Sequence, residues 1–218
     1  MSQRLPAPDH DRILATKPRN SEVTLLPRRT RLTRLHFLGG AHPSDWHAFR
    51  TWGPTTSRFD HHPEPVGDHP AYGILYAGIG NAAFTTVLAE CFASGSDSVG
   101  PIDRGRNRPM LTIFSLEDEL RLLRLEGGWV TRAGGNQAIC SGERDRARMW
   151  AREIHSCFAD IDGVTYTSSV WGPGTCVALW ERAARALPAT PDAIRPLGDP
   201  SLATALAAAA IGLGVALV

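Results

Sequence analysis

Residues 73–92, GILYAGIGNAAFTTVLAECF, join an apolar run, a glycine-containing turn and a second apolar stretch. The run 74–77 is short and apolar, which predicts a buried strand. In the second stretch the apolar positions recur at helical intervals: Phe84, Val87, Leu88 and Cys91. This spacing predicts a helix with one apolar face, and Asn81 is its expected N-cap. The whole stretch therefore predicts a buried strand followed directly by a helix, with Glu90 near the end of that helix.

Outward from this unit, short strands and helices follow one another without regular βαβ alternation. Strands are predicted at residues 32–38, 111–116, 120–125, 164–168 and 176–180, and helices at 44–50, 144–158 and 181–187. Residues 51–70 and 94–109 are rich in Gly, Pro and polar side chains, which predicts loops. We see no internal repeat and no linker, so the pattern predicts a single α+β domain.

Composition is that of an ordinary soluble globular protein. The 218 residues are 43% hydrophobic and 21% charged, and the net charge of +1 gives no reason to expect direct nucleic-acid or membrane binding. Lys17 is the one lysine among 23 basic residues, which we attribute mainly to coding bias and less to phosphate recognition. The cysteines form no C-x-x-C pair and are expected to be free, buried thiols in a reducing cytoplasm: Cys91, Cys140, Cys157 and Cys176. The polar N-terminus does not resemble a secretory signal.

The two ends of the chain each leave alternatives open. Residues 1–30 contain four prolines and little periodicity, which predicts an extended arm that is either solvated or in contact with an acidic partner or DNA. Residues 201–218 carry no charge and have nearly the length of a membrane span. Their many Ala and Gly residues favour a buried helix at 202–210 instead, started by Asp199 and Pro200 and ended by Gly212. A core strand is then expected at 213–218.

Four polar residues stand at the edges of otherwise apolar elements: Arg58, Tyr76, Glu90 and Ser168. Each alone has an ordinary interpretation as a surface arginine, a core tyrosine, an ion-paired carboxylate or a strand hydroxyl. A carboxylate among apolar residues is costly unless it is paired or faces a cleft. Together, the four residues predict a site that binds an anionic, aromatic substrate and polarises one of its bonds.

Several common motifs are absent. Residues 78–81, GIGN, lack the third glycine of a dinucleotide fingerprint and the Gly-Lys-Ser/Thr of a P-loop, so a plain strand-to-helix turn is favoured. A helix N-terminus can still hold an anion without either motif. His61, His62 and His69 lie in one loop without metal-ligand spacing, and no metal site is expected. The lack of a Gly-x-Ser-x-Gly elbow argues against a serine hydrolase.

Four short segments, taken in order, resemble the RES-domain family: 58–60 (RFD), 73–77 (GILYA), 82–90 (AAFTTVLAE) and 162–168 (DGVTYTS). The resemblance extends over roughly 32–218, so residues 31–218 are assigned to a RES domain. It implies a bacterial toxin of a type II toxin–antitoxin module that degrades NAD+ by hydrolysis or phosphorolysis and arrests growth. It also implies a split mixed β-sheet flanked by helices, similar to ADP-ribosyltransferase toxins.

The family residues carry over to Arg58, Tyr76, Glu90 and Ser168. Ser57 stands where many members have glycine, and Ser169 follows Ser168, so the functional serine could be either one. The implied roles are cation stabilisation by Glu90, pairing of Arg58 with diphosphate or phosphate, and stacking of Tyr76 on nicotinamide. Ser168 would bond the carboxamide or position Glu90.

The resemblance also implies the ligands and partners. NAD+ is the expected substrate, with inorganic phosphate as co-substrate in phosphorolysis and no other cofactor. An Xre-like helix-turn-helix antitoxin is the expected partner, and a homodimer is left open. Two other functions remain as alternatives: an ADP-ribosyltransferase that modifies a macromolecule, and a non-enzymatic binding module.

Overall fold

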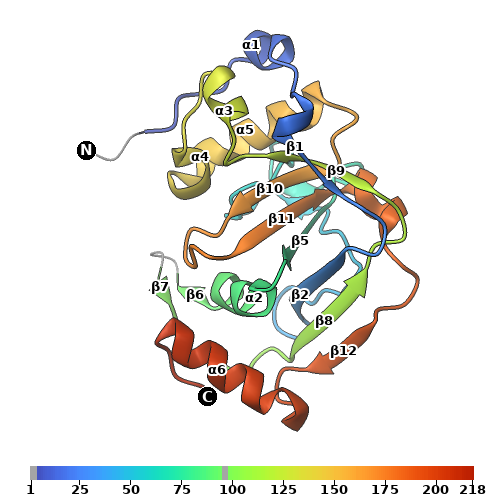
Figure 1. The fold of residues 1–218 in the computed structure, drawn as a ribbon, viewed down its shortest axis with the longest axis vertical. Coiled ribbons are helices and arrows are strands. Elements are labelled where there is room, and N and C mark those ends of the chain that lie inside the picture. Colours follow the sequence, from blue (N-terminus) through green and yellow to red (C-terminus); the bar gives the residue numbers. More distant parts are fainter. Residues whose placement is uncertain (1–3, 95–97) are drawn as a thin grey trace.

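A mixed sheet of eight strands forms the centre of the computed structural model, which describes residues 4–94 and 98–218 (Figure 1). The strand order is β1-β9-β10-β11-β5-β2-β8-β12. The bounds are β1 Val23–Leu26, β2 Arg31–Phe37, β5 Ile74–Ile79, β8 Pro109–Ser115, β9 Leu120–Arg124, β10 Gly163–Thr167, β11 Thr175–Trp180 and β12 Ala193–Pro196. Neighbouring strands are antiparallel except β9 and β10, which run parallel.

The sheet divides between β2 and β5. These strands pair at only two positions, Leu32 with Ile79 and Thr33 with Gly78. In contrast, β5 pairs with β11 at six positions, from Ile74–Trp180 to Ile79–Thr175. Beyond Thr33 the two halves of the sheet diverge, as a split sheet requires. The expected fold class, a single domain with a split mixed sheet and flanking helices, is confirmed.

Helices cover this sheet in two groups (Figure 1). One group contains α1 (His10–Ala15), α3 (Gly128–Arg132), α4 (Ala138–Ser141) and α5 (Arg144–Cys157). The other contains α2 (Ala83–Cys91), which contacts β2, β5 and β11, and α6 (Ala203–Leu213), which packs on α2. The remaining elements are short: η1 Asn20–Glu22, η2 Glu181–Ala186, η3 Pro200–Leu202, and the strand pairs β3 Trp52–Gly53 with β4 Gly67–Asp68 and β6 Ala93–Ser94 with β7 Ser98–Val99.

The strand and helix expected from residues 73–92 form as β5 and α2. Gly80 makes the turn between them with φ of 78°, a left-handed conformation that favours glycine. A Cβ on Gly78 would lie 3.0 Å from the Ala83 carbonyl oxygen, so this glycine allows α2 to pack closely on β5. The expected cap is wrong: the N-cap is Ala82 rather than Asn81, and it makes no side-chain capping bond.

The prediction of an extended N-terminal arm is wrong for residues 4–30, which fold onto the rest of the domain. Leu5 and Ile13 are buried, and β1 pairs with β9. Trp150 Nε1 donates to the Pro6 carbonyl at 2.9 Å, and Trp129 Nε1 donates to the Thr16 carbonyl at 2.7 Å. Two buried indoles therefore find their hydrogen-bond acceptors in this segment, which the local sequence did not reveal. The assignment of 31–218 to a RES domain stays a prediction.

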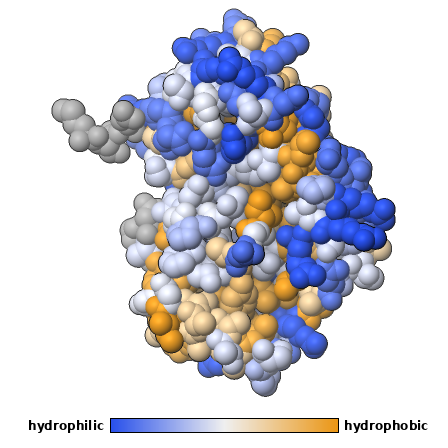
Figure 2. Space-filling model, in the orientation of Figure 1, coloured by the Kyte–Doolittle hydropathy of each residue, from blue (hydrophilic) through white to orange (hydrophobic). Residues whose placement is uncertain are grey.

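The C-terminal prediction is right in part. Asp199 accepts the Ser201 amide, as expected, but α6 continues to Leu213 and ends at Gly214, whose φ is 69°. The expected strand at 213–218 is a single bridge from Leu217 to Ile102, and β12 forms the sheet edge instead. The outer face of α6 is exposed and apolar (Figure 2), with Ile211 82% exposed. Among the described residues no helix has the length and apolar character needed to cross a membrane.

Two further predicted helices, at 44–50 and 181–187, do not form as α-helices. Residues 44–50 form turns rather than a helix, and the backbone of Arg50 bonds that of Ile74 instead. The helix expected at 181–187 is the 3-10 helix η2, Glu181–Ala186. The loop expected at 51–70 includes the short β3–β4 pair, and part of the loop expected at 94–109 lies outside the described residues.

Candidate active site

A cavity of about 260 Å³ lies where the sheet divides, and it is closed on one side by α2. Three of the four predicted site residues line it: Arg58, Tyr76 and Glu90. The fourth, Ser168, is 4% exposed and lies one hydrogen bond behind the cavity wall. Ser169, the alternative serine, lines the cavity itself. Residues that are distant in sequence thus meet because β5, α2 and β10 converge at the split.

Glu90 is held by Ser168. The Ser168 Oγ donates to Glu90 Oε1 at 2.6 Å. The same Oγ accepts the backbone N–H of Trp171 at 2.9 Å and of Val170 at 3.3 Å. Because two N–H donors occupy the lone pairs of this hydroxyl, its proton is directed to the carboxylate. The pair therefore orients an acceptor carboxylate at the cavity wall.

Arg58 lies in a turn that brings it against the start of the α5 segment. Its side chain is only 8% exposed, and Nη1 donates to the Gly142 carbonyl at 2.6 Å. The next residue, Phe59, is fully buried and packs on the ring of Tyr166 with centroids 4.5 Å apart. The guanidinium thus has a fixed position next to the cavity.

Asp60 fixes the loop that carries Arg58. The buried Asp60 carboxylate accepts from Arg50, from the Thr55 amide and hydroxyl at 2.7 and 2.8 Å, and from His62. Burial alone would raise the pKa of Asp60, but the hydrogen bond from His62 and the charge of Arg50 outweigh it and hold that pKa well below its usual value. Asp60 is therefore ionised, and its role is to support the loop.

Tyr76 lies on β5 and lines the cavity. Burial raises the pKa of its hydroxyl far above the usual range, so the group is a neutral phenol. Ser57 and the backbone of Phe59 lie near this hydroxyl. Even so, the buried oxygen makes no hydrogen bond of normal geometry within the described part of the chain. Tyr76 is suited to contact an aromatic ligand with its ring rather than to transfer a proton.

Sequence reasoning missed several cavity residues: Cys91, Arg144, Tyr166 and Cys176. The signal for Tyr166 was present, since it precedes Ser168 by two positions in the strand expected at 164–168 and would share its face. The expectation that the cysteines are buried is wrong for Cys91, which is exposed, and for Cys157, which is half-buried; Cys91 Sγ donates to the Leu35 carbonyl at 3.8 Å. No local signal distinguishes Arg144 from the other arginines.

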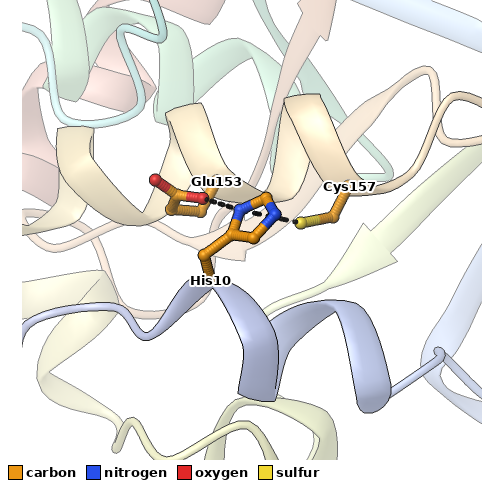
Figure 3. A group of neighbouring side chains, drawn as sticks. All are labelled: His10, Glu153 and Cys157. Carbon is orange, nitrogen blue, oxygen red and sulfur yellow. Dashed lines mark hydrogen bonds and ion pairs between the residues drawn. The ribbon is translucent and has the colours of Figure 1, made fainter.

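Among the described residues, two groups outside the cavity lining have the donor atoms to hold a metal ion. In the first, His10 of α1 points toward α5 (Figure 3), with Nδ1 at 2.7 Å from Glu153 Oε2 and 3.7 Å from Cys157 Sγ. In the second, His61 and His155 contact the two oxygens of Glu181 at 3.2 and 2.8 Å. The expectation that the protein holds no metal stays a prediction.

His61 predicts a pH dependence of stability. Burial lowers the pKa of this histidine from its usual 6.5 to about 4. Between these pH values the unfolded chain binds the proton and the folded chain does not, so stability falls as the pH drops from 6.5 to 4. The shift corresponds to a loss of roughly 3 kcal/mol. Urea unfolding at pH 7 and 4.5 should show a smaller loss in His61→Gln, which keeps a donor but does not titrate. Equal losses in both proteins would contradict this assignment.

The fold and the cavity together define a class: an α+β protein whose split sheet holds a serine-bound carboxylate, an arginine and a tyrosine at one cavity. Among solved structures, this fold is similar to a chain of the crystal structure of the M. tuberculosis MbcT–MbcA toxin–antitoxin complex. The match covers 91% of this chain and 96% of that one, with a TM-score of 0.57 and 16% identity. No family model and no curated protein sequence matches the chain.

Proposed function

We propose that this protein is a toxin of the RES-domain type that degrades NAD+ by cleaving the bond between nicotinamide and ribose. The observation that carries this proposal is the placement of Glu90, which Ser168 orients beside a cavity that Arg58 and Tyr76 also line. The arginine, tyrosine, carboxylate and serine expected from the sequence are thus grouped around one cavity.

The chemistry follows from the leaving group. When the bond from ribose C1′ to the pyridinium nitrogen breaks, its electron pair goes to that nitrogen, and nicotinamide leaves as a neutral molecule. Positive charge develops on the ribose as an oxocarbenium ion. The Glu90 carboxylate, already oriented, stabilises this charge without reorganising. In hydrolysis, water then bonds to C1′ and releases one proton; in phosphorolysis, a phosphate oxygen forms that bond.

The other side chains bind the substrate. Tyr76 and Tyr166 offer ring faces to nicotinamide within the cavity. Arg58 offers a planar guanidinium for an anion of the substrate or for inorganic phosphate. Ser168 acts through Glu90, because its hydroxyl is committed to that carboxylate and to two amides.

A toxin that consumes NAD+ needs a neutralising partner. The structural neighbour comes from a toxin–antitoxin complex, which supports an antitoxin partner for this chain as well. The sequence resemblance points to an antitoxin of the Xre-like helix-turn-helix class. We expect the toxin to act in the cytoplasm, on NAD+ there.

The direct test is turnover of NAD+ by the purified protein, with and without inorganic phosphate and with products resolved by mass. We expect free nicotinamide together with ADP-ribose, or with ADP-ribose 1″-phosphate when phosphate is the acceptor. ADP-ribose attached to an added protein or nucleic acid would instead establish the transferase alternative. Calorimetry that detects binding of neither NAD+ nor ADP-ribose would favour a non-enzymatic binding module.

Ser168→Ala tests the positioning role. Without the hydroxyl, Glu90 loses the donor at 2.6 Å, and we expect kcat for NAD+ to fall about tenfold with KM little changed. Ser169→Ala is the matched control, and we expect it to retain more activity. The reverse order of these two effects would transfer the role to Ser169.

A further inference from the structure

Arg144 is a cavity residue that the proposed chemistry has not used. It is the first residue of α5, it is half-buried, and it lines the same cavity as Glu90. Its neighbours on the helix have partners: Arg148 pairs with Asp145, and Arg146 contacts Met149. The Arg144 side chain has no ion pair or hydrogen bond within the part of the chain that the structure describes. A half-buried guanidinium that lines a cavity and forms no ion pair with a carboxylate is suited to bind an anionic ligand.

The surroundings of the cavity add positive charge. Arg58 lines it too. Its guanidinium donates to the carbonyl of Gly142, which is two residues before Arg144 in the chain. A third, Arg34, is buried in β2 next to Leu35, which lines the cavity. Arg34 Nη2 donates to the Ala48 carbonyl at 3.3 Å. Glu90 is the one carboxylate in the lining of this cavity as described. Like charges in one site repel, and an anion between them relieves this repulsion.

The size of the cavity indicates which part of a ligand the arginines meet. Pockets that enclose small ligands usually measure ~300–1,000 Å³, whereas this one measures about 260 Å³. This volume is of the order needed for nicotinamide and its ribose rather than for a whole dinucleotide. The rest of the molecule then extends out of the cavity, and Arg144, which lines the cavity and is partly exposed, is available to bind it.

We propose that Arg144, together with Arg58, forms a diphosphate subsite at the rim of the cavity. This inference rests on the proposed function and defines its substrate class: a nicotinamide ribose whose 5′ position carries a diphosphate. The guanidinium of Arg144 binds the bridging phosphates, and Glu90 contacts the ribose deeper in the cavity. Diphosphate binding thereby sets the depth to which the nicotinamide end enters.

The test compares a substrate with diphosphate and one without. Kinetics are measured on NAD+ and on nicotinamide riboside, which lacks phosphate, for wild type, Arg144→Gln, Arg144→Lys and Arg146→Gln. For Arg144→Gln we expect KM for NAD+ to rise about 10- to 100-fold, which corresponds to loss of one charge-assisted contact. We expect kcat/KM for the riboside to stay within about twofold. Arg144→Lys should be intermediate because it keeps the charge but not the fork.

The control is Arg146→Gln, which removes the same charge from the same helix but outside the cavity lining. We expect it to behave as wild type on both substrates. An equal loss of riboside and NAD+ turnover in Arg144→Gln would mean a structural role and would overturn the subsite. Unchanged NAD+ kinetics in Arg144→Gln would also overturn it while leaving the proposed function intact.

Binding of ADP by calorimetry gives a readout that needs no turnover. We expect wild type to bind ADP and Arg144→Gln to bind it about 10- to 100-fold more weakly. If the protein turned over neither substrate but showed this difference, the proposed function would fail and the diphosphate subsite would stand. If wild type and Arg144→Gln bound ADP equally well, the proposed subsite would be wrong.

Discussion

The Glu90→Gln protein should turn over NAD+ at least ~100-fold more slowly than wild type, because it lacks the negative charge that stabilises the developing oxocarbenium ion. The substitution is nearly isosteric. The amide oxygen of glutamine can still accept the Ser168 hydroxyl, so the hydrogen bond of 2.6 Å has a counterpart in the variant. The loss should appear in kcat, with a small change in KM, because charge develops only in the transition state. Release of nicotinamide under saturating NAD+ measures it.

Glu126→Gln is the matched control for this experiment. Glu126 accepts the Thr167 hydroxyl at 3.1 Å, one residue before Ser168, but does not line the cavity. The Glu126→Gln substitution therefore removes a second carboxylate near the end of β10, and we expect nearly wild-type turnover. Comparable turnover in a folded Glu90→Gln protein would exclude Glu90 from the reaction. Equal defects in both variants would indicate a general electrostatic effect rather than a specific role.

Trp150→Ala should lower the free energy of unfolding by about 3–5 kcal/mol, the range for loss of a large aromatic core side chain. Trp150 is fully buried on α5 and packs edge-to-face on Trp129, with centroids 6.3 Å apart. Its Nε1 also holds the Pro6 carbonyl, so the substitution opens a cavity and releases one contact to the N-terminal segment. Urea denaturation at neutral pH measures the change.

Trp150→Phe separates these two contributions. Phenylalanine retains much of the packing but cannot donate to Pro6, and we expect it to cost about 1–2 kcal/mol. A protease that cleaves near the N-terminus should then cut this variant faster than wild type, since the segment is held less firmly. A Trp150→Ala protein as stable as Trp150→Phe would show that packing of this indole contributes little.

The elements that sequence predicted well are those whose apolar pattern is local and regular. β5, α2, α5, β10 and β11 all lie close to their expected positions because strand runs and helical spacing mark them directly. β12 was missed because all four of its residues are exposed and one is proline; its pairing with β8 creates it as a strand. The N-terminal segment was misjudged because its acceptors for Trp129 and Trp150 are backbone carbonyls, which carry no sequence signal.

The candidate site was likewise predictable only in part. Arg58, Tyr76, Glu90 and Ser168 could be selected from sequence because each is a polar residue in an apolar context and their order resembles a family pattern. The bond between Ser168 and Glu90 could not be predicted, since it depends on how α2 packs across the end of β10. Arg144 could not be selected either, because an unpaired guanidinium differs from a paired one only by its surroundings in space.

From its sequence alone, this protein is an α+β domain with a strand–helix unit at residues 73–92 and four polar residues suited to one site. The tertiary structure decided that the sheet opens between β2 and β5, that the first thirty residues belong to the domain as far as they are described, and that Arg144 joins the cavity. The reason is physical. Hydrophobic periodicity is a property of neighbouring residues, whereas strand register, buried hydrogen-bond partners and the charge around a cavity depend on residues that folding brings together from distant parts of the chain.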